Sequence, residues 1–272
     1  MPETIAAFVG AIPVNYDRHL GPILFHHYAD DLVARLPARR GLRVLETACG
    51  TGIVTRRLAD RLGADGRLVA TDLNQAMIDH ARGQVTSPAP VEWQATDATR
   101  LPFPDRSFDA VVCQFGIMFF PDKSAGLREA LRVLEPGGVH LFNVWDAIEH
   151  NDVTRIAHET IASFFPDDSP RFYTVPFGFH DRDVIQSMLA GAGFERIQHE
   201  TVEKVGTSPS AADAATGLIE GNPVMGEIMS RRPDALSDIK AALTRNIATR
   251  LGDEPVRCSL RAVVWAAHRP GG

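Results

Sequence analysis

The sequence predicts an α/β fold in which helices cover both faces of a mostly parallel sheet. Its 272 residues are enough to bury a large core. Hydrophobic residues make up 44% and charged residues 23%, proportions close to those of ordinary globular proteins. Between residues 43 and 145, short apolar runs alternate with helical patterns, which is typical of βαβ units. The parallel part of the sheet should therefore lie in this region.

The region begins with an expected strand, Arg43–Glu46, and a helix, Ile53–Leu62, whose Val54, Leu58 and Leu62 repeat every four residues. The next expected elements are a strand at 67–72, a helix at 75–82, strands at 91–95 and 108–114, a helix carrying the apolar positions 127, 130, 131 and 134, and a strand at 139–145. Residues 108–114 are nearly all apolar, so we expect this strand at the centre of the sheet. The Glu-Pro-Gly-Gly run at 135–138 should end the preceding helix and turn the chain.

The second half of the chain adds a helix, Asp181–Ala190, with Asp181 as its N-cap and Gly191 and Gly193 at its end. A strand at 194–205 follows, and a β-rich run at 256–268 could pair with it in antiparallel fashion. The remaining segments exceed what the sheet needs, and such additions usually cap an α/β site. The expected organisation is an N-terminal helical cap segment (1–40), an α/β core (41–146), a cap insertion (147–180), a continuation of the core (181–207), a helical cap insertion broken by prolines (208–255) and a last core strand (256–272).

Composition excludes several classes of protein. The net charge is −6, and the basic residues cluster only as doublets, so a nucleic-acid partner is not expected. Cys49, Cys113 and Cys258 are isolated, which indicates neither a disulfide framework nor a metal site. No apolar run approaches the roughly 18 residues of a membrane span. We therefore expect a cytoplasmic protein without a bound metal.

Residues that could bind a ligand lie at the expected carboxyl ends of the strands. Gly50 and Gly52 lie where the first strand becomes the first helix, and they permit a tight turn and a close approach to a ligand. Asp72 closes the second strand, 20 residues beyond Gly52, where a carboxylate can accept both hydroxyls of an adenosine ribose. Enzymes that bind dinucleotides share both features.

Glu46, at the end of the first strand, distinguishes a dinucleotide from a positively charged ligand. A carboxylate there disfavours a pyrophosphate but favours a ligand with an ammonium and a sulfonium group. The third glycine of a dinucleotide-binding turn is also replaced, by Thr55. Asp97 follows the third strand, where it can accept from an adenine amino group, and Gln114 follows the fourth, at the floor of the cleft.

This pattern resembles class I S-adenosylmethionine-dependent methyltransferases, in the broad group that includes the ubiquinone/menaquinone-biosynthesis type. The resemblance covers about residues 41–145 and is carried by Val44–Gly52, Ala70–Asn74, Asp97–Ala98 with Leu101–Phe103, Phe108–Gly116 and Leu134–Gly138. It implies a three-layer Rossmann-like methyltransferase sheet with an antiparallel last strand. It also implies that S-adenosyl-L-methionine is the cofactor and S-adenosyl-L-homocysteine the product.

The resemblance further implies that Glu46 faces the methionine ammonium, Asp72 holds the ribose and Asp97 recognises the adenine amino group. The full set of expected cofactor-binding residues is Tyr16, Glu46, Ala48, Cys49, Gly50, Gly52, Asp72, Leu73, Met77, Asp97, Ala98 and Gln114. In this set, Leu73 and Ala98 would sandwich the adenine, Gln114 would lie near the methionyl end, and Tyr16 would close over the cofactor.

The expected reaction is an in-line methyl transfer to a small acceptor, in which the protein mainly supplies alignment and excludes water. A base is needed only if the acceptor must lose a proton, and His19 is our candidate among ten histidines, although a capping or surface role is the commoner one. The aromatic segment 164–179 would suit an apolar or aromatic acceptor if it forms a lid, or would simply pack on the core. Two alternatives stay open: a nicotinamide-dependent oxidoreductase, which Glu46 and Thr55 oppose, and a cofactor-binding protein without catalysis.

Overall fold

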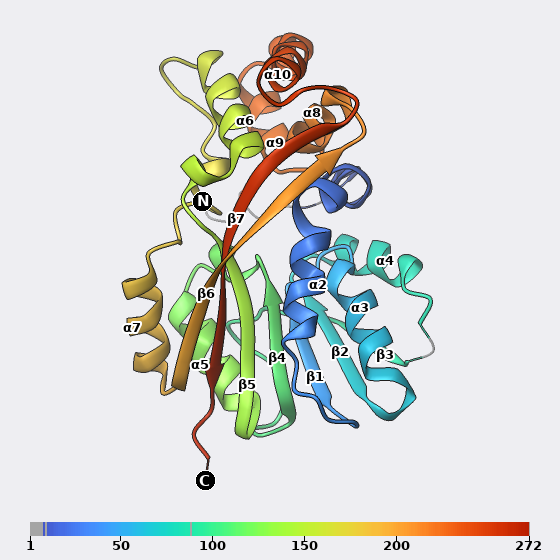
Figure 1. The fold of residues 1–272 in the computed structure, drawn as a ribbon, viewed down its shortest axis with the longest axis vertical. Coiled ribbons are helices and arrows are strands. Elements are labelled where there is room, and N and C mark those ends of the chain that lie inside the picture. The colour runs from blue at the N-terminus through green and yellow to red at the C-terminus, as the bar shows by residue number, and fades with distance from the viewer. Residues whose placement is uncertain (1–7, 9, 88, 272) are drawn as a thin grey trace.

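The computed structural model describes residues 8, 10–87 and 89–271 and contains one seven-stranded sheet. Residues 1–7 and 9 of the expected N-terminal segment, together with Pro88 and Gly272, lie outside this description. The strand order is β3-β2-β1-β4-β5-β7-β6 (Figure 1). The strands are β1 (Arg43–Thr47), β2 (Arg67–Asp72), β3 (Val91–Ala95), β4 (Phe108–Gln114), β5 (Leu134–Trp145), β6 (Glu195–Ser208) and β7 (Val256–His268).

Strands β1 to β5 pair in parallel, whereas β7 is antiparallel to both of its neighbours, β5 and β6. The expected α/β class, with a mostly parallel sheet and an antiparallel last strand, is therefore confirmed. The apolar strand β4 is central, as predicted. The order of the strands reverses between β1 and β4, and ligands of α/β sheets bind beyond the carboxyl ends of the strands at such a point.

Helices cover both faces of the sheet. In Figure 1, α2 and α3 lie in front of β1 and β2, and α5 lies behind β5. The helices are α1 (Ile12–Asn15), the π-helix η1 (Tyr16–Phe25), α2 (His26–Ala34), α3 (Ile53–Leu62), α4 (Gln75–Gln84), α5 (Lys123–Val133), α6 (Asp152–Ser163), α7 (Arg182–Ala192), α8 (Ala211–Glu220), α9 (Val224–Arg231) and α10 (Leu236–Leu251). Short 3₁₀ turns are η2 (Gly63–Asp65), η3 (Ile117–Phe119), η4 (Ile148–His150), η5 (Phe172–Thr174) and η6 (Pro233–Ala235). Among the described residues, no helix has the combination of length and apolarity that a membrane span requires.

The additional helices gather beyond the carboxyl edge of the sheet. Because β6 and β5 are both antiparallel to β7, the chain leaves β6 at the same edge as it leaves β5. The ends of β6 and β7 continue past β5, where Glu203–Ser208 pairs with Val256–Arg261. Helices α6, α8, α9 and α10 lie above this extension, near the N-terminal helices (Figure 1).

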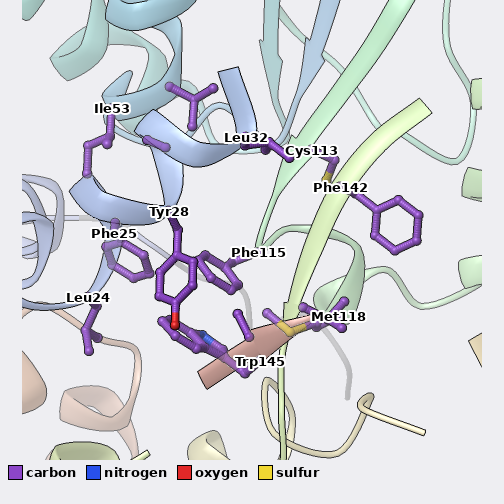
Figure 2. Packing of buried hydrophobic residues seen from close by; sticks show 14 of the residues in the cluster. Leu24, Phe25, Tyr28, Leu32, Ile53, Cys113, Phe115, Met118, Phe142 and Trp145 are labelled. Carbon is purple, nitrogen blue, oxygen red and sulfur yellow. The ribbon is translucent and has the colours of Figure 1, made fainter. Parts of the chain in front are cut away.

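A cluster of aromatic rings joins the N-terminal helices to the sheet. Figure 2 shows Tyr28 of α2 beside Phe115 and Trp145, whose rings stack at 3.9 Å between centroids. Tyr28 meets both rings edge-on at 5.4 Å, and its hydroxyl donates to the Val202 carbonyl at 3.2 Å. Burying each such side chain stabilises the fold by roughly 2 kcal/mol. The floor beneath the carboxyl ends of β4 and β5 is therefore tightly packed.

Several predicted boundaries differ from the structure, and two of these differences have a clear physical reason. We expected residues 135–138 to separate a helix from a strand starting at Val139, but β5 already begins at Leu134, which pairs with Phe108. The left-handed Gly137 (φ +78°) donates to the Arg269 carbonyl, and the register with β4 shifts here, from Leu134 paired with Phe108 to Val139 paired with Ala110. Helix α7 also continues through Gly191, because the left-handed cap is supplied by Gly193 at φ +100°. The N-cap at Asp181 is confirmed: its side chain accepts from the backbone of residues 183 and 184.

Candidate active site

A cavity lies at the carboxyl ends of β1, β2, β3 and β4, on both sides of the point where the strand order reverses. It contains about 770 Å³ of empty space, part of it open to solvent. A second cavity of about 290 Å³ adjoins it, and both are bordered by Tyr16, Ala48, Gly50 and Gln114. The two together form the candidate site.

The structure brings together eleven of the twelve residues that the sequence marked for the cofactor. The main cavity is lined by Tyr16, Ala48, Gly50, Asp72, Leu73, Met77, Asp97, Ala98 and Gln114. Glu46 and Cys49 border the smaller cavity. Gly52 borders neither, because it is the left-handed N-cap of α3 (φ +80°) and a Cβ there would lie 3.0 Å from the Ala81 Cβ. Its absent side chain lets α3 and α4 approach, so its contribution is to packing.

The turn after β1 presents backbone to the cavity. Ala48, Gly50 and Gly52 all adopt left-handed conformations, at φ +53°, +54° and +80°. The turn is closed by two hydrogen bonds: the Cys49 N–H donates to the Thr71 carbonyl at 2.9 Å, and the Gly52 N–H to the Cys49 carbonyl at 3.0 Å. A left-handed alanine is strained, and such strain is concentrated at functional sites.

Asp72 is buried and organises this turn. Its Oδ2 accepts from the Gly50 N–H at 2.9 Å, and its Oδ1 accepts from the Asn74 N–H at 2.8 Å. Burial raises the pKa of Asp72, although these donors act in the opposite direction. The Asn74 side-chain amide also donates to Oδ1 at 3.3 Å. Because each carboxylate oxygen can accept two hydrogen bonds, the capacity left for a ligand's hydroxyl is on Oδ2.

Glu46 and Gln114 present unsatisfied oxygens to the smaller cavity. Glu46 is only 2% exposed, and its Oε2 has no hydrogen-bond partner among the described residues. Burial raises the pKa of Glu46 to about 8, and the charge of Asp72 acts in the same direction. The Gln114 amide donates to the Phe25 carbonyl at 3.4 Å, and its buried Oε1 likewise lacks a partner within the described chain. Two free acceptors beside one small space fit a group with several donors, such as an ammonium.

Asp97, which is polar, and Leu73, which is apolar, both border the main cavity. Asp97 caps its own turn, accepting from the Thr99 N–H at 2.8 Å and the Thr99 hydroxyl at 2.7 Å through Oδ1. Its Oδ2 takes no part in this turn. Leu73 is 64% exposed, unusual for a large apolar side chain at the border of a cavity. A flat apolar ring with a polar edge would contact both.

In the loop after β4, the sequence predicted the place of Gln114 but not the contacts of Phe115 and Gly116. Phe115 is left-handed (φ +50°), and its N–H donates to the Asn143 side chain at 3.0 Å. A Cβ on Gly116 would lie 2.4 Å from the Ala48 Cβ, so this glycine lets the loops after β1 and β4 touch. Sequence spacing carries no signal for that contact, because it joins residues 68 positions apart.

An aromatic wall completes the main cavity. Its rings are Phe8, Tyr16, Phe115, Phe119 and Phe120. Phe8 meets Tyr16 and Phe119 edge-on, at 5.9 Å and 6.0 Å between centroids. Phe8 had no signal in the sequence, because no periodic pattern surrounds it. The wall makes this side of the cavity apolar.

The structure does not place His19 at either cavity. Its Nδ1 lies 3.3 Å from Asp213 Oδ1, and Gly217 of α8 packs against its Cβ. The aromatic segment 164–179 packs behind the wall, with Phe172 stacked on Phe119 at 6.1 Å and Phe177 on Trp145 at 5.9 Å. Of the two roles considered for this segment, the structure shows packing on the core.

Comparison with known proteins agrees with this geometry. A family model described as a methyltransferase domain matches residues 44–138. The ubiquinone/menaquinone biosynthesis C-methyltransferase UbiE of Idiomarina loihiensis is 31% identical over 180 residues, which cover 60% of this chain and 70% of that protein. A putative methyltransferase from Bacillus halodurans has the same fold, with a TM-score of 0.59 and 22% identity over 89% of this chain and 98% of that chain. The phosphoethanolamine N-methyltransferase 2 of Haemonchus contortus, solved with phosphomonomethylethanolamine and S-adenosylhomocysteine, has a TM-score of 0.60 and 18% identity over 95% of this chain and 57% of that chain.

Proposed function

Because the chain belongs to the family of S-adenosylmethionine-dependent methyltransferases, we propose that the two adjoining cavities hold its cofactor and that the acceptor is a small apolar or aromatic molecule. The enzyme transfers a methyl group from S-adenosyl-L-methionine and releases S-adenosyl-L-homocysteine. The family membership removes the nicotinamide-dependent oxidoreductase from consideration.

The observation that carries the proposed site is the pair of oxygens, on Glu46 and Gln114, that have no partner among the described residues. They border the smaller cavity, where an ammonium would supply the missing donors. The main cavity then offers Asp72 to the ribose hydroxyls, with Leu73 and Ala98 on the faces of the adenine. Asp97 Oδ2 is available to the adenine amino group, and Met77 borders the same end.

In this proposal the cofactor supplies a methyl group already activated by a sulfonium. The chain's own residues then have to align the acceptor and keep water away, effects that together account for roughly 7 to 11 kcal/mol in well-oriented reactions. The aromatic wall of Phe8, Phe115, Phe119 and Phe120 fits both tasks for an apolar acceptor. We therefore assign no catalytic base.

The proposed division of labour follows the architecture. We propose that residues 41–146 form the cofactor-binding core, which residues 181–207 and 256–272 continue, and that 1–40, 147–180 and 208–255 form the cap. The described residues of 147–180 and 208–255 border neither cavity. A small-molecule acceptor, and not nucleic acid, agrees with the net charge of −6. The three cysteines are free thiols, which fits a reducing compartment such as the cytoplasm.

Calorimetric titration tests the cofactor site directly. We expect S-adenosylhomocysteine to bind and NAD not to bind; tighter binding of NAD would refute the proposal. Turnover is then measured as release of S-adenosylhomocysteine from S-adenosylmethionine with each acceptor class in turn. The relatives' names describe C-methylation in ubiquinone and menaquinone biosynthesis, so phenolic and quinol acceptors form the first arm. Turnover with RNA or a protein, and none with aromatic small molecules, would refute the proposed acceptor class.

A further inference from the structure

Asp17, in the first turn of η1, joins the N-terminal segment to three parts of the core. Its Oδ1 accepts from the Thr51 hydroxyl at 3.2 Å and from the Arg56 guanidinium at 3.1 Å. Its Oδ2 lies 3.6 Å from His80 Nε2. These partners belong to the turn after β1, to α3 and to α4, and the carboxylate is only 19% exposed. One side chain therefore connects η1 to the turn after β1, to α3 and to α4.

The segment that Asp17 fastens is poorly suited to hold itself in place. η1 is a ten-residue π-helix with Pro22 in its interior, which provides no N–H to the helical ladder. From Leu20 onward it is fixed by burial, with Leu20, Ile23 and Leu24 in the core. Residues 16–19 are half-buried or exposed, although the Tyr16 ring packs against the core, and Val14 just before them is 54% exposed. The polar contacts of Asp17 therefore add to the packing of Tyr16 at the end nearest the cavity.

Tyr16, the neighbour of Asp17, borders both cavities. Its ring stacks on Phe25 at 4.7 Å between centroids and is nearly parallel to it. Adjacent residues on a helix point in different directions, so Asp17 can bond to the core while Tyr16 borders the cavity. Thr51 completes the link, because it lies between Gly50, whose N–H donates to Asp72, and Gly52.

We propose that Asp17 is a positioning residue for the cofactor: by holding η1 against the glycine turn, α3 and α4, it keeps Tyr16 at the cavity wall. This inference rests on the proposed function, since Tyr16 affects binding only if the cofactor occupies these cavities. Asp17 itself lines neither cavity, so it acts through Tyr16.

The test is a double-mutant cycle in S-adenosylhomocysteine binding, measured by calorimetry on the full chain. Asp17→Ala should weaken binding about tenfold, the scale of a lost charge-assisted hydrogen bond. If Asp17 acts through Tyr16, Tyr16→Ala combined with Asp17→Ala should be little worse than the more damaging single change. Asp17→Asn keeps a side-chain oxygen for Thr51 and Arg56 and should restore most of the affinity.

Asp30→Ala is the matched control. Asp30 of α2 pairs with Arg57 of α3, so it also ties the N-terminal segment to that helix, but it is 64% exposed and lines neither cavity. Asp30→Ala should leave the affinity for S-adenosylhomocysteine unchanged, even where it changes the melting temperature as much as Asp17→Ala does. Full affinity in Asp17→Ala, or independent effects of Asp17 and Tyr16, would overturn the inference while leaving the proposed function intact. If Asp17→Ala does not fold, Arg56→Ala removes the other side of the same ion pair and is combined with Tyr16→Ala in the same cycle. A wild-type chain that does not bind the ligand would instead overturn the proposed site.

Discussion

Glu46→Gln should make the protein more stable and weaken its cofactor binding under the same conditions. Glu46 is 2% exposed, and burial raises its pKa to about 8 from 4.5. A folded-state pKa above the unfolded one means that the folded chain holds this proton more tightly. The side chain is therefore tolerated fully below pH 4.5, and it destabilises the fold progressively as the pH rises toward 8. The difference of 3.5 units, from 4.5 to 8, corresponds to at most about 5 kcal/mol above pH 8.

The neutral glutamine avoids this destabilisation. We expect the free energy of unfolding of Glu46→Gln to exceed that of the wild type by less than about 1 kcal/mol at pH 5 and by several kcal/mol at pH 8. Chemical denaturation at the two pH values measures the difference. A variant that is less stable than the wild type at pH 8 would show that the carboxylate is already compensated in the ligand-free site.

The affinity for the cofactor should rise with pH, whereas the stability of the ligand-free wild type should fall. With a pKa of about 8, about one molecule in eleven has Glu46 ionised at pH 7, and ionising the rest costs about 1.4 kcal/mol, or about 2.7 kcal/mol at pH 6. Affinity for S-adenosylhomocysteine should therefore rise about tenfold from pH 6 to 7, level off above 8, and be accompanied by proton release. Glu46→Gln should bind more weakly at pH 8 and lose this dependence.

Calorimetry in buffers of different ionisation enthalpy counts the released protons. 5′-Methylthioadenosine is the matched control ligand, because it keeps the adenosine but lacks the amino acid that would face Glu46. Its pH dependence reports on Asp72, whose pKa is also raised by burial. Equal proton release with both ligands, or with and without Glu46, would refute the assignment of Glu46 to the ammonium.

Three further outcomes follow from the geometry. Asp72→Ala should abolish detectable binding of S-adenosylhomocysteine by calorimetry while the chain remains folded by circular dichroism, because the carboxylate both faces the cavity and holds the turn; unchanged binding would show that the site is misassigned. Gly116→Ala should lower the same affinity at least tenfold, since a Cβ placed 2.4 Å from that of Ala48 forces two cavity loops apart, and a variant with wild-type affinity would show that the loops yield freely. His19→Gln should leave the rate of methyl transfer within about twofold and lower the melting temperature slightly, because the ring pairs with Asp213 away from the cavity; a large loss of rate at unchanged stability would restore His19 as a base.

Local patterns in the sequence predicted the elements that depend on local forces. Ile53–Leu62 and Val256–His268 have the predicted bounds because their apolar periodicity coincides with glycine and proline signals at their ends. The start of β5 was missed because Leu134 pairs with Phe108 before the residues of the expected turn, which shift the register of the strand without ending it. A local pattern contains no information about the partner strand.

The same distinction holds at the site. Residues at the ends of strands could be assigned because parallel strands bring their carboxyl ends to one edge. The link from Asp17 to Arg56 and the touch of Gly116 on Ala48 could not, because each joins residues distant in sequence whose approach depends on the assembled sheet. Phe8 reaches the cavity for the same reason.

Three carboxylates approach the turn after β1, and their charge explains which ligand fits it. Asp72 bonds to the backbone of Gly50, Asp17 bonds to Thr51, and Glu46 lies buried beneath at the end of β1. Arg56 is already engaged by Asp17, so it offers little compensation to an incoming anion. A pyrophosphate resting on this turn would be repelled by each ionised carboxylate and would supply no donor to Glu46, whereas an ammonium would supply donors and favour the ionised form of Glu46. The glycine turn that the fold shares with dinucleotide-binding proteins is thus directed toward a cationic methyl donor by the acids placed around it.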